Sequence, residues 1–257
     1  MAIAPLRRED TPAPSQTTPP GTPPKLRDAR SNGRLASTPS PTPHARPRRE
    51  RSLGRAVLAW LDSVTWTEKA YFALPESNHI VELVDGRLVI PDMPTIHHQR
   101  VVRDFAFRLH DWNAEHKAGE VLFSAYPIRL KPGLIREPDV MFYLNEHRSR
   151  MQVQRGGPPD LVVEVLSPST RRIDQGAKLA QYAEARVTEY WLMDPDQHWV
   201  EVHALENGRY QHLGRFSPGE EATSRLLPGF TVAVADLFSP SPSLGEAGAH
   251  SGNGQRG

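Results

Sequence analysis

One stretch of the sequence, residues 159–170, reads PDLVVEVLSPST. Its apolar run, residues 161–166, lies between a proline and a Ser-Pro pair. A short apolar run bounded by turn-forming residues is typical of a strand that is buried on both faces of a sheet. Glu164 lies in the middle of this run, where an unpaired carboxylate would be costly to bury. We therefore expect a cation, a metal ion or a hydrogen-bond network to meet Glu164.

The composition narrows the class of protein. The 257 residues carry a formal net charge of +1, so the total charge indicates no particular partner. The absence of cysteine excludes disulfides, thiol nucleophiles and thiolate zinc sites. No apolar stretch approaches the roughly 20 residues of a membrane span, and the N-terminus lacks the apolar core of a signal peptide. We expect a cytoplasmic protein that does not bind membranes.

Both ends of the chain are poor in large apolar residues. Residues 1–52 are rich in Pro, Thr, Ser and Arg, and residues 239–257 are rich in Ser, Pro and Gly. Such segments cannot bury enough surface to offset the entropy lost on ordering. We expect two disordered tails around a single domain, residues 53–238. The basic end of the first tail could bind nucleic acid weakly through its charge. Alternatively, the tail is only solvated, or the start site has been placed too far upstream.

Inside the domain, hydrophobic periodicity and turn signals predict the elements. Helices are expected at residues 56–61, 67–74, 95–117 (ended by Gly119) and 172–186. Strands are expected at residues 121–130, 135–144, 161–166 and 188–193, in hairpins 79–84/87–90 and 199–205/209–213, and in the closing segment 226–234. This order predicts a mixed α/β (α+β) fold, with a central mixed sheet flanked by helices around one core.

Three acidic residues fall in or beside predicted strands: Glu82, Asp139 and Glu164. If the strand after Asp139 pairs with the central stretch, the carboxylates of Asp139 and Glu164 converge. Carboxylate oxygens and water are the ligands that Mg²⁺ or Mn²⁺ prefers. Lys178, about three turns into the next helix, is placed to bring an ammonium to the same point. Two carboxylates, a metal ion and a lysine suit phosphodiester hydrolysis.

Each of these residues also has a simpler interpretation. Asp139 after a proline is often a turn residue at strand entry, and Glu164 could pair with a structural arginine such as Arg136 or Arg171. Lys178 could be a solvated helix residue linked to Asp174 four positions earlier. The pair at positions 97–98, His97 and His98, either contacts phosphate or is a polar surface feature, and we favour the surface. Trp191 and Trp199 are expected in the core.

Several separate motifs, taken in order, resemble the Uma-type family of bacterial restriction endonucleases, a former family of unknown function within the PD-(D/E)XK superfamily. The resemblance runs from about Thr65 to Phe238. Its motifs are residues 81–86, His97, residues 138–140, residues 160–170, Asp174, Lys178, Tyr182, residues 189–191 and residues 227–230. It implies a restriction-endonuclease-like core and a Mg²⁺- or Mn²⁺-dependent endonuclease that hydrolyses phosphodiester bonds in DNA.

The resemblance also implies roles for particular residues. Asp139 and Glu164 correspond to the two metal-binding acids, helped by the Val165 carbonyl. The superfamily lysine normally follows the second acid by two positions, where this sequence has Leu166, so Lys178 takes that role. Glu82 resembles an auxiliary catalytic acid that usually lies on a helix. Related nucleases often act as dimers, so a homodimer is possible here.

Two other classes of function stay open at this point. A nucleic-acid-binding or interaction module could keep the fold and be catalytically silent. Glu164 could equally serve an ion pair in a purely structural domain. No glycine-rich phosphate loop, nucleophile elbow or zinc spacing favours a further class.

Overall fold

The computed structural model describes residues 64–75 and 79–238. The two expected tails and the predicted helix at 56–61 therefore lie outside the described residues. The pattern of contacts separates the chain after Val64, and the description below concerns the unit that begins at Thr65. Within the described part, no helix is both long and apolar enough to cross a membrane.

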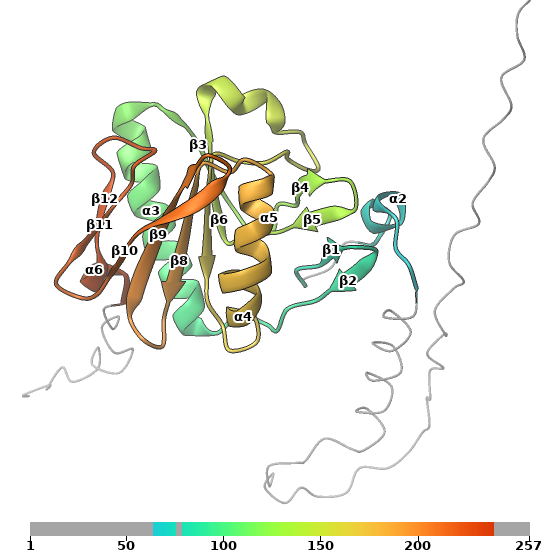
Figure 1. The fold of residues 1–257 in the computed structure, drawn as a ribbon, viewed down its shortest axis with the longest axis horizontal. Coiled ribbons are helices and arrows are strands. Elements are labelled where there is room, and N and C mark those ends of the chain that lie inside the picture. Colours follow the sequence, from blue (N-terminus) through green and yellow to red (C-terminus); the bar gives the residue numbers. More distant parts are fainter. Residues whose placement is uncertain (1–63, 76–78, 239–257) are drawn as a thin grey trace, which may run out of the picture. The chain divides into compact units, whose positions relative to one another are not determined.

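A six-stranded mixed sheet forms the centre of the domain (Figure 1). Its order is β10-β9-β8-β7-β6-β3, and only the β7–β8 pair among these neighbours is parallel. The strands are β3 (Gly119–Phe123), β6 (Val140–Leu144), β7 (Leu161–Val165), β8 (Glu189–Asp194), β9 (Trp199–Glu206) and β10 (Arg209–Phe216). Every residue of β7 and β8 is buried, because both faces of the sheet are covered.

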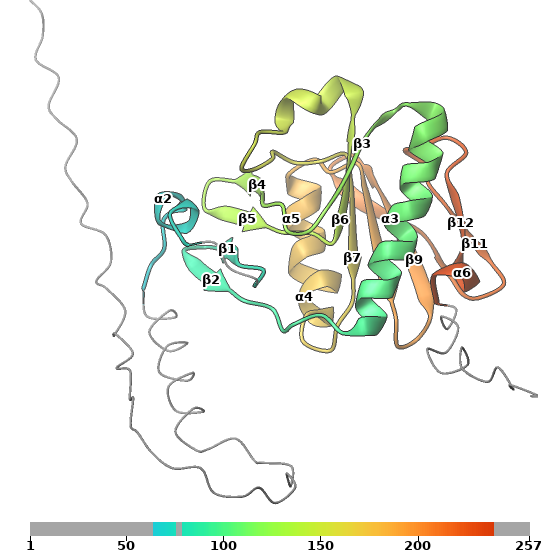
Figure 2. The ribbon, with the colours of Figure 1, turned by 180° about the vertical axis from the view of Figure 1, so that it is seen from behind.

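Helices cover the two faces of this sheet. Helix α3 (Ile96–His116) packs Val101, Phe105 and Leu109 against one face, with the side chains of Val163 and Trp191. On the other face, Tyr182 of α5 (Leu179–Glu184) belongs to a second apolar cluster. Figures 1 and 2 show α5 in front of the sheet and α3 behind it, then the reverse. The predicted mixed α/β fold is confirmed, with its core in two clusters on either side of the sheet.

Smaller elements surround the main sheet. The hairpin β1 (Glu82–Val84) and β2 (Arg87–Val89) pairs through β1 with β5 (Leu134–Arg136), which pairs with β4 (Ile128–Lys131). Thr67 caps α2 (Glu68–Phe72), as predicted, by accepting a hydrogen bond from the amide of Ala70. Further elements are η1 (Asn145–Arg150), β11 (Glu221–Thr223), β12 (Thr231–Ala233) and α6 (Val234–Phe238).

Two predicted strands, residues 121–130 and 135–144, are each divided between the two sheets. β3 ends at Phe123 and the chain resumes as β4, while β5 ends at Arg136 and resumes as β6. Each break contains a proline, Pro127 or Pro138, which cannot donate a ladder hydrogen bond. The two segments that pass from one sheet to the other are linked by a hydrogen bond, which the amide of Ser124 donates to the carbonyl of Asp139. Asp139 therefore lies at the junction between the sheets.

The predicted helix at residues 172–186 is interrupted. It begins as α4 (Arg171–Ile173), widens into a π-helical turn, η2 (Asp174–Lys178), and continues as α5. Both Asp174 and Lys178 of the π turn are buried. Single π turns inside helices occur frequently at functional sites.

Candidate active site

Strand pairing brings the two predicted metal-binding acids together. Val140 of β6 pairs with Val163 of β7, so the preceding Asp139 lies opposite the following Glu164. Side chains two positions apart share a face of a strand, and the neighbours Met141 and Val162 belong to the cluster on the α5 face. Asp139 and Glu164 therefore point to the same face, and they are only 7% and 4% exposed.

Asp139 is held at its position by the backbone of β7. The amide of Val165 donates to Oδ2 of Asp139 at 2.7 Å. The side chain of His98 approaches the same oxygen, with Nε2 at 3.4 Å. Asp139 does precede a strand, as its simpler interpretation expected, but it is buried there and fixed by two donor groups.

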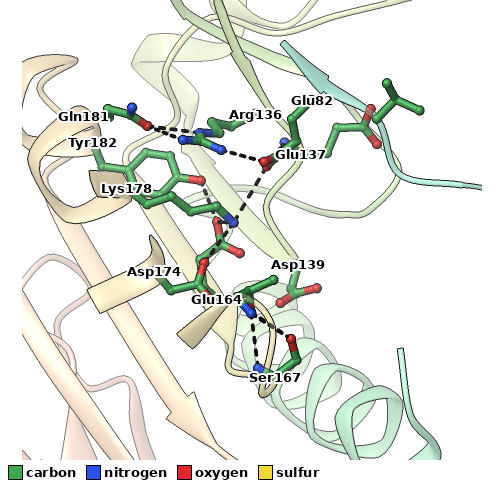
Figure 3. A network of polar contacts seen from close by, with 12 residues as sticks. Glu82, Arg136, Glu137, Asp139, Glu164, Ser167, Asp174, Lys178, Gln181 and Tyr182 are labelled. Carbon is green, nitrogen blue, oxygen red and sulfur yellow. Dashed lines mark hydrogen bonds and ion pairs between the residues drawn. The ribbon is translucent and has the colours of Figure 1, made fainter. Parts of the chain in front are cut away.

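The cation that meets Glu164 is Lys178. Its Nζ lies 2.9 Å from Oε1 of Glu164, 3.0 Å from Oδ1 of Asp174 and 3.7 Å from Oε1 of Glu82. Figure 3 shows the ammonium among these three carboxylates. The expected link to Asp174 is present, but the interpretation of Lys178 as a solvated residue is wrong, because its side chain is only 6% exposed.

The alternative partners suggested for Glu164 are also wrong. Arg136 pairs instead with Glu82, with Nη1 2.6 Å from Oε2, and it donates from Nε and Nη2 to Oε1 of Gln181. Arg171 pairs with Asp194 at the end of β8. Both guanidinium groups are therefore engaged elsewhere, and neither fills the space between Asp139 and Glu164.

Glu82 lies at the start of β1, as predicted, rather than on a helix. Its carboxylate is buried between Arg136 and Lys178, and it also accepts a hydrogen bond from the amide of Glu137 at 3.3 Å. One carboxylate oxygen of Glu82 lies against Arg136 and the other against Lys178, so both buried cations share this acid.

Sequence reasoning did not assign a role to Tyr182, although the motif comparison included it. Its hydroxyl donates to Oε1 of Glu164 at 2.6 Å. Tyr182 follows Lys178 by four positions, one turn further along the same helix, so both side chains reach the same carboxylate. The helix therefore supplies two donors to Glu164, and this fixes its rotamer.

The cluster contains more carboxylates than cationic side chains. Burial raises the pKa of Glu164 to about 8, against the opposing charge of Lys178, and the carboxylates of Asp174, Asp139 and Glu82 add to the rise. Burial disfavours the charged form of Lys178, but Glu164, Glu82 and Asp174 outweigh it and raise the pKa of the ammonium. Both shifts favour the protonated form of the side chain concerned.

His98 was misjudged, since the expected surface position applies only to its neighbour. His97 is exposed, whereas His98 is buried beside Asp139. Burial lowers the pKa of His98, but Asp139 and the backbone of Val165 outweigh it and raise that pKa overall. The helix period contained the signal: position 98 precedes the buried positions 101, 105 and 109 by three- and four-residue steps.

Glu137 is a second residue that sequence reasoning missed. It lies two positions before Asp139 and accepts a hydrogen bond from the hydroxyl of Tyr71 at 3.0 Å. Burial raises the pKa of Glu137 to about 7, and the nearby charge of Glu82 adds to the rise. Because it falls in the break between β5 and β6, strand periodicity could not indicate its direction.

A pocket of about 60 Å³ opens onto these groups. Asp139, Glu164, Val165, His98 and Lys178 are among its lining residues. This volume accommodates a few water molecules or a small hydrated ion. Two carboxylates and a backbone carbonyl form an oxygen donor set that fits Mg²⁺ or Mn²⁺.

The described residues contain no cluster of three or more His, Cys, Asp or Glu side chains arranged to hold a metal ion. This does not conflict with the oxygen donor set. Mg²⁺ is usually bound through one or two carboxylates, with water and substrate phosphate completing its coordination. The residues present therefore fit such an ion without a closed protein cage.

Comparisons with known proteins agree with the architecture. Among solved structures, the chain is similar to a crystal structure from Anabaena variabilis described as a "putative nuclease belonging to DUF820". The TM-score is 0.58 at 17% identity, and the match covers 67% of this chain and 97% of the other. At this identity the likeness shows the fold alone. No protein in a search of curated proteins matches the chain.

The sequence also matches a family model. The Uma2 model, described as "Putative restriction endonuclease", matches residues 68–235, which is more than half of the 257-residue chain. The matched range includes every residue of the cluster described above. The chain belongs to the Uma2 family of nuclease-like proteins.

Proposed function

We propose that this protein is a divalent-metal-dependent endonuclease that hydrolyses phosphodiester bonds in DNA. One observation carries the proposal: Asp139 and Glu164 share a face and a pocket, and the ammonium of Lys178 lies 2.9 Å from Glu164. These groups come from three separate elements, and a purely structural ion pair would not require the second carboxylate. The family match supports a nuclease, while the metal and the DNA substrate belong to the proposal.

Asp139, Glu164 and the carbonyl of Val165 would hold Mg²⁺ or Mn²⁺. When bound, a divalent ion supplies Lewis-acid activation of water and neutralises charge on the phosphate. The hydrogen bond from the Val165 amide orients Asp139. The hydroxyl of Tyr182 orients Glu164. Both acids are therefore presented in fixed rotamers before any ligand arrives.

Lys178 acts as a donor in this proposal. Its surroundings keep the ammonium protonated, so it cannot accept a proton as a general base. It can donate an N–H to the attacking water or to a phosphate oxygen and stabilise developing negative charge. Glu82 assists by holding Lys178 from the side opposite Glu164. A cytoplasmic setting and a homodimer, both expected from the sequence, stay predictions.

Cleavage of supercoiled plasmid DNA tests the proposal. The purified protein should nick or linearise the plasmid with Mg²⁺ or Mn²⁺ and not with EDTA, and Asp139→Asn and Glu164→Gln should abolish cleavage. Glu184→Gln is the control, because it also removes one carboxylate, but from an exposed pair with Lys131 at the end of α5. Cleavage that survives in Asp139→Asn would show a contaminating nuclease.

The catalytically silent module is the alternative. It is favoured by the fact that Glu164 already has two partners, Lys178 and Tyr182. Calorimetry with Mn²⁺ separates the two functions. Heat of binding in the wild type that disappears in Glu164→Gln supports the metal site, whereas equal heats, together with intact plasmid, support the silent module.

A further inference from the structure

A second cavity, of about 290 Å³, lies at the N-terminal end of α3. It is bordered by the start of α3, the turn between β8 and β9, and α6, which the ribbon places at one edge of the domain (Figure 2). Its lining residues are His97, Arg100, Val101, Pro195, His198, Leu237 and Phe238. None of the residues proposed for catalysis is among them.

The polar wall of this cavity is basic. It consists of His97, Arg100 and His198. No acidic side chain of the described residues pairs with Arg100. The acids nearest in sequence to the cavity have other cationic partners: Asp104 pairs with Arg103, Asp236 with Arg108, and both Asp194 and the exposed Asp196 with Arg171. A guanidinium without a carboxylate partner, in one cavity with two imidazoles, is suited to an anion.

The rest of the lining includes the apolar side chains of Val101, Leu237 and Phe238. A free inorganic phosphate has no apolar group that could contact these side chains. A nucleic-acid backbone has one, because its anionic phosphate is linked to a less polar sugar. The mixed lining therefore favours a phosphodiester strand over an isolated anion.

The cavity adjoins the candidate active site through consecutive residues. His97 lines the basic cavity, while His98 lines the pocket that holds Asp139 and Glu164. Consecutive positions of an α-helix point about 100° apart, so the two cavities lie on adjoining sides of the first turn of α3. A strand that passes this turn with one phosphate at the catalytic acids can bring another phosphate to Arg100.

We propose that the cavity of His97, Arg100 and His198 binds a backbone phosphate of the nucleic-acid strand, next to the phosphate at the catalytic acids. The inference rests on the proposed nuclease function, because that function supplies the strand. Such a contact fixes the register of the substrate and reads no bases. It assigns the substrate class of this face as a polynucleotide and not a mononucleotide.

Salt-dependent binding tests this assignment. A fluorescently labelled 20-nucleotide single-stranded DNA is titrated with the wild type, Arg100→Gln, Arg100→Lys and Lys117→Gln in EDTA, over a series of salt concentrations. Lys117 is the matched control, because it lies just beyond the other end of α3 and has no carboxylate partner among the described residues. Thermal midpoints verify that all variants are folded.

Arg100→Gln should reduce the slope of log affinity against log salt by about 0.7, the value of one phosphate contact on a single strand. Arg100→Lys should keep most of the slope, and Lys117→Gln should keep it fully. Millimolar thymidine monophosphate should compete poorly. Equal slopes for Arg100→Gln and Lys117→Gln, or efficient competition by the mononucleotide, would overturn the inference.

The measurement is independent of cleavage, because EDTA removes the metal. A wild type that binds through Arg100 but leaves plasmid intact with Mg²⁺ would refute the proposed activity and keep the phosphate site. Cleavage that depends on Asp139, combined with an unchanged slope in Arg100→Gln, would refute the phosphate site and keep the activity.

Discussion

The ammonium of Lys178 lies 2.9 Å from the carboxylate of Glu164, although the two residues come from different elements of the fold. In the nuclease superfamily that this family resembles, the lysine normally follows the second acid by two positions on the same strand. Here that position is Leu166, which is buried in the apolar cluster on the α5 face. The π turn of the following helix delivers the amine to that same face.

Replacing this amine should impair chemistry and stability together. Lys178→Met should lower the rate of plasmid cleavage by about 10²–10³-fold, the usual effect of removing one donor that stabilises transition-state charge. It should also lower the free energy of unfolding by about 3 kcal/mol at pH 8, because it leaves buried carboxylates without a partner. The loss should be smaller at pH 6, where Glu164 can take up a proton. Urea unfolding at the two pH values measures it.

Lys131→Met is the control for this variant, since Lys131 forms an exposed pair with Glu184. It should change neither cleavage nor stability by more than about 1 kcal/mol. A Lys178→Met protein with wild-type cleavage would remove the lysine from the mechanism.

The buried pair of Glu82 and Arg136 should be strongly coupled. Both side chains are 3% exposed or less, and Arg136 also donates to Gln181. A double-mutant cycle with Glu82→Gln and Arg136→Met should give a coupling near the upper end of the usual range of about 0.5–3 kcal/mol. The same cycle on the exposed pair of Arg148 and Glu120 should give about 0.2–1 kcal/mol. Similar couplings at both pairs would contradict this prediction.

Stability in EDTA should fall as the pH rises from about 5 to 8. The pKa of Glu164 in the folded state, about 8, lies above its usual value of 4.5. The folded state therefore favours the protonated acid, and the stability that this provides is lost as the pH approaches 8. Glu137, with its pKa raised to about 7, acts in the same direction. Glu164→Gln should show a shallower fall in a calorimetric pH series.

Added Mn²⁺ should reverse this trend in the wild type, because the ion binds the ionised carboxylate and releases its proton. The thermal midpoint with Mn²⁺ should then increase between pH 6 and 8. Identical pH series for the wild type and Glu164→Gln would show that this carboxyl group does not titrate as described.

His98 should affect metal binding through Asp139. His98→Ala removes the imidazole 3.4 Å from Oδ2 and leaves the Val165 amide as the remaining donor. Loss of such an orienting partner typically weakens metal affinity by about 10–100-fold. Calorimetry with Mn²⁺ measures this, with the exposed His110 on the same helix as the control, replaced by alanine. Unchanged affinity in His98→Ala would limit this residue to packing.

Local signals in the sequence predicted much of the fold. The apolar run around Glu164 indicated the central strand, and Thr95 indicated the start of α3. The Asp-Gly and Asn-Gly pairs mark the hairpins, because both residues of each pair adopt positive φ. Gly119, expected to end α3, instead begins β3, where a Cβ would meet the carbonyl of Tyr143 at 2.0 Å. Lys117 adopts the left-handed conformation that ends the helix.

The site was harder to predict because its contacts are not local. Glu82 and Arg136 are 54 residues apart, and nothing in their neighbourhoods encodes the pairing. The burial of His98 follows the helix period, but a histidine at a helix start is usually read as polar surface. The division of two predicted strands depends on which sheet each half joins, and alternation of apolar residues is the same in either sheet.

The π turn at residues 174–178 sets the phase between the two ends of the helix that contains it. One residue of a regular helix turns the chain by about 100°. Deleting Gly176 would leave Asp174 and Lys178 three positions apart, still neighbours on a helix. It would, however, turn Arg171 relative to Lys178, so the guanidinium and the ammonium would not both keep their present partners, Asp194 and Glu164. The extra residue of this turn therefore lets one helix serve two carboxylates at different places on the sheet.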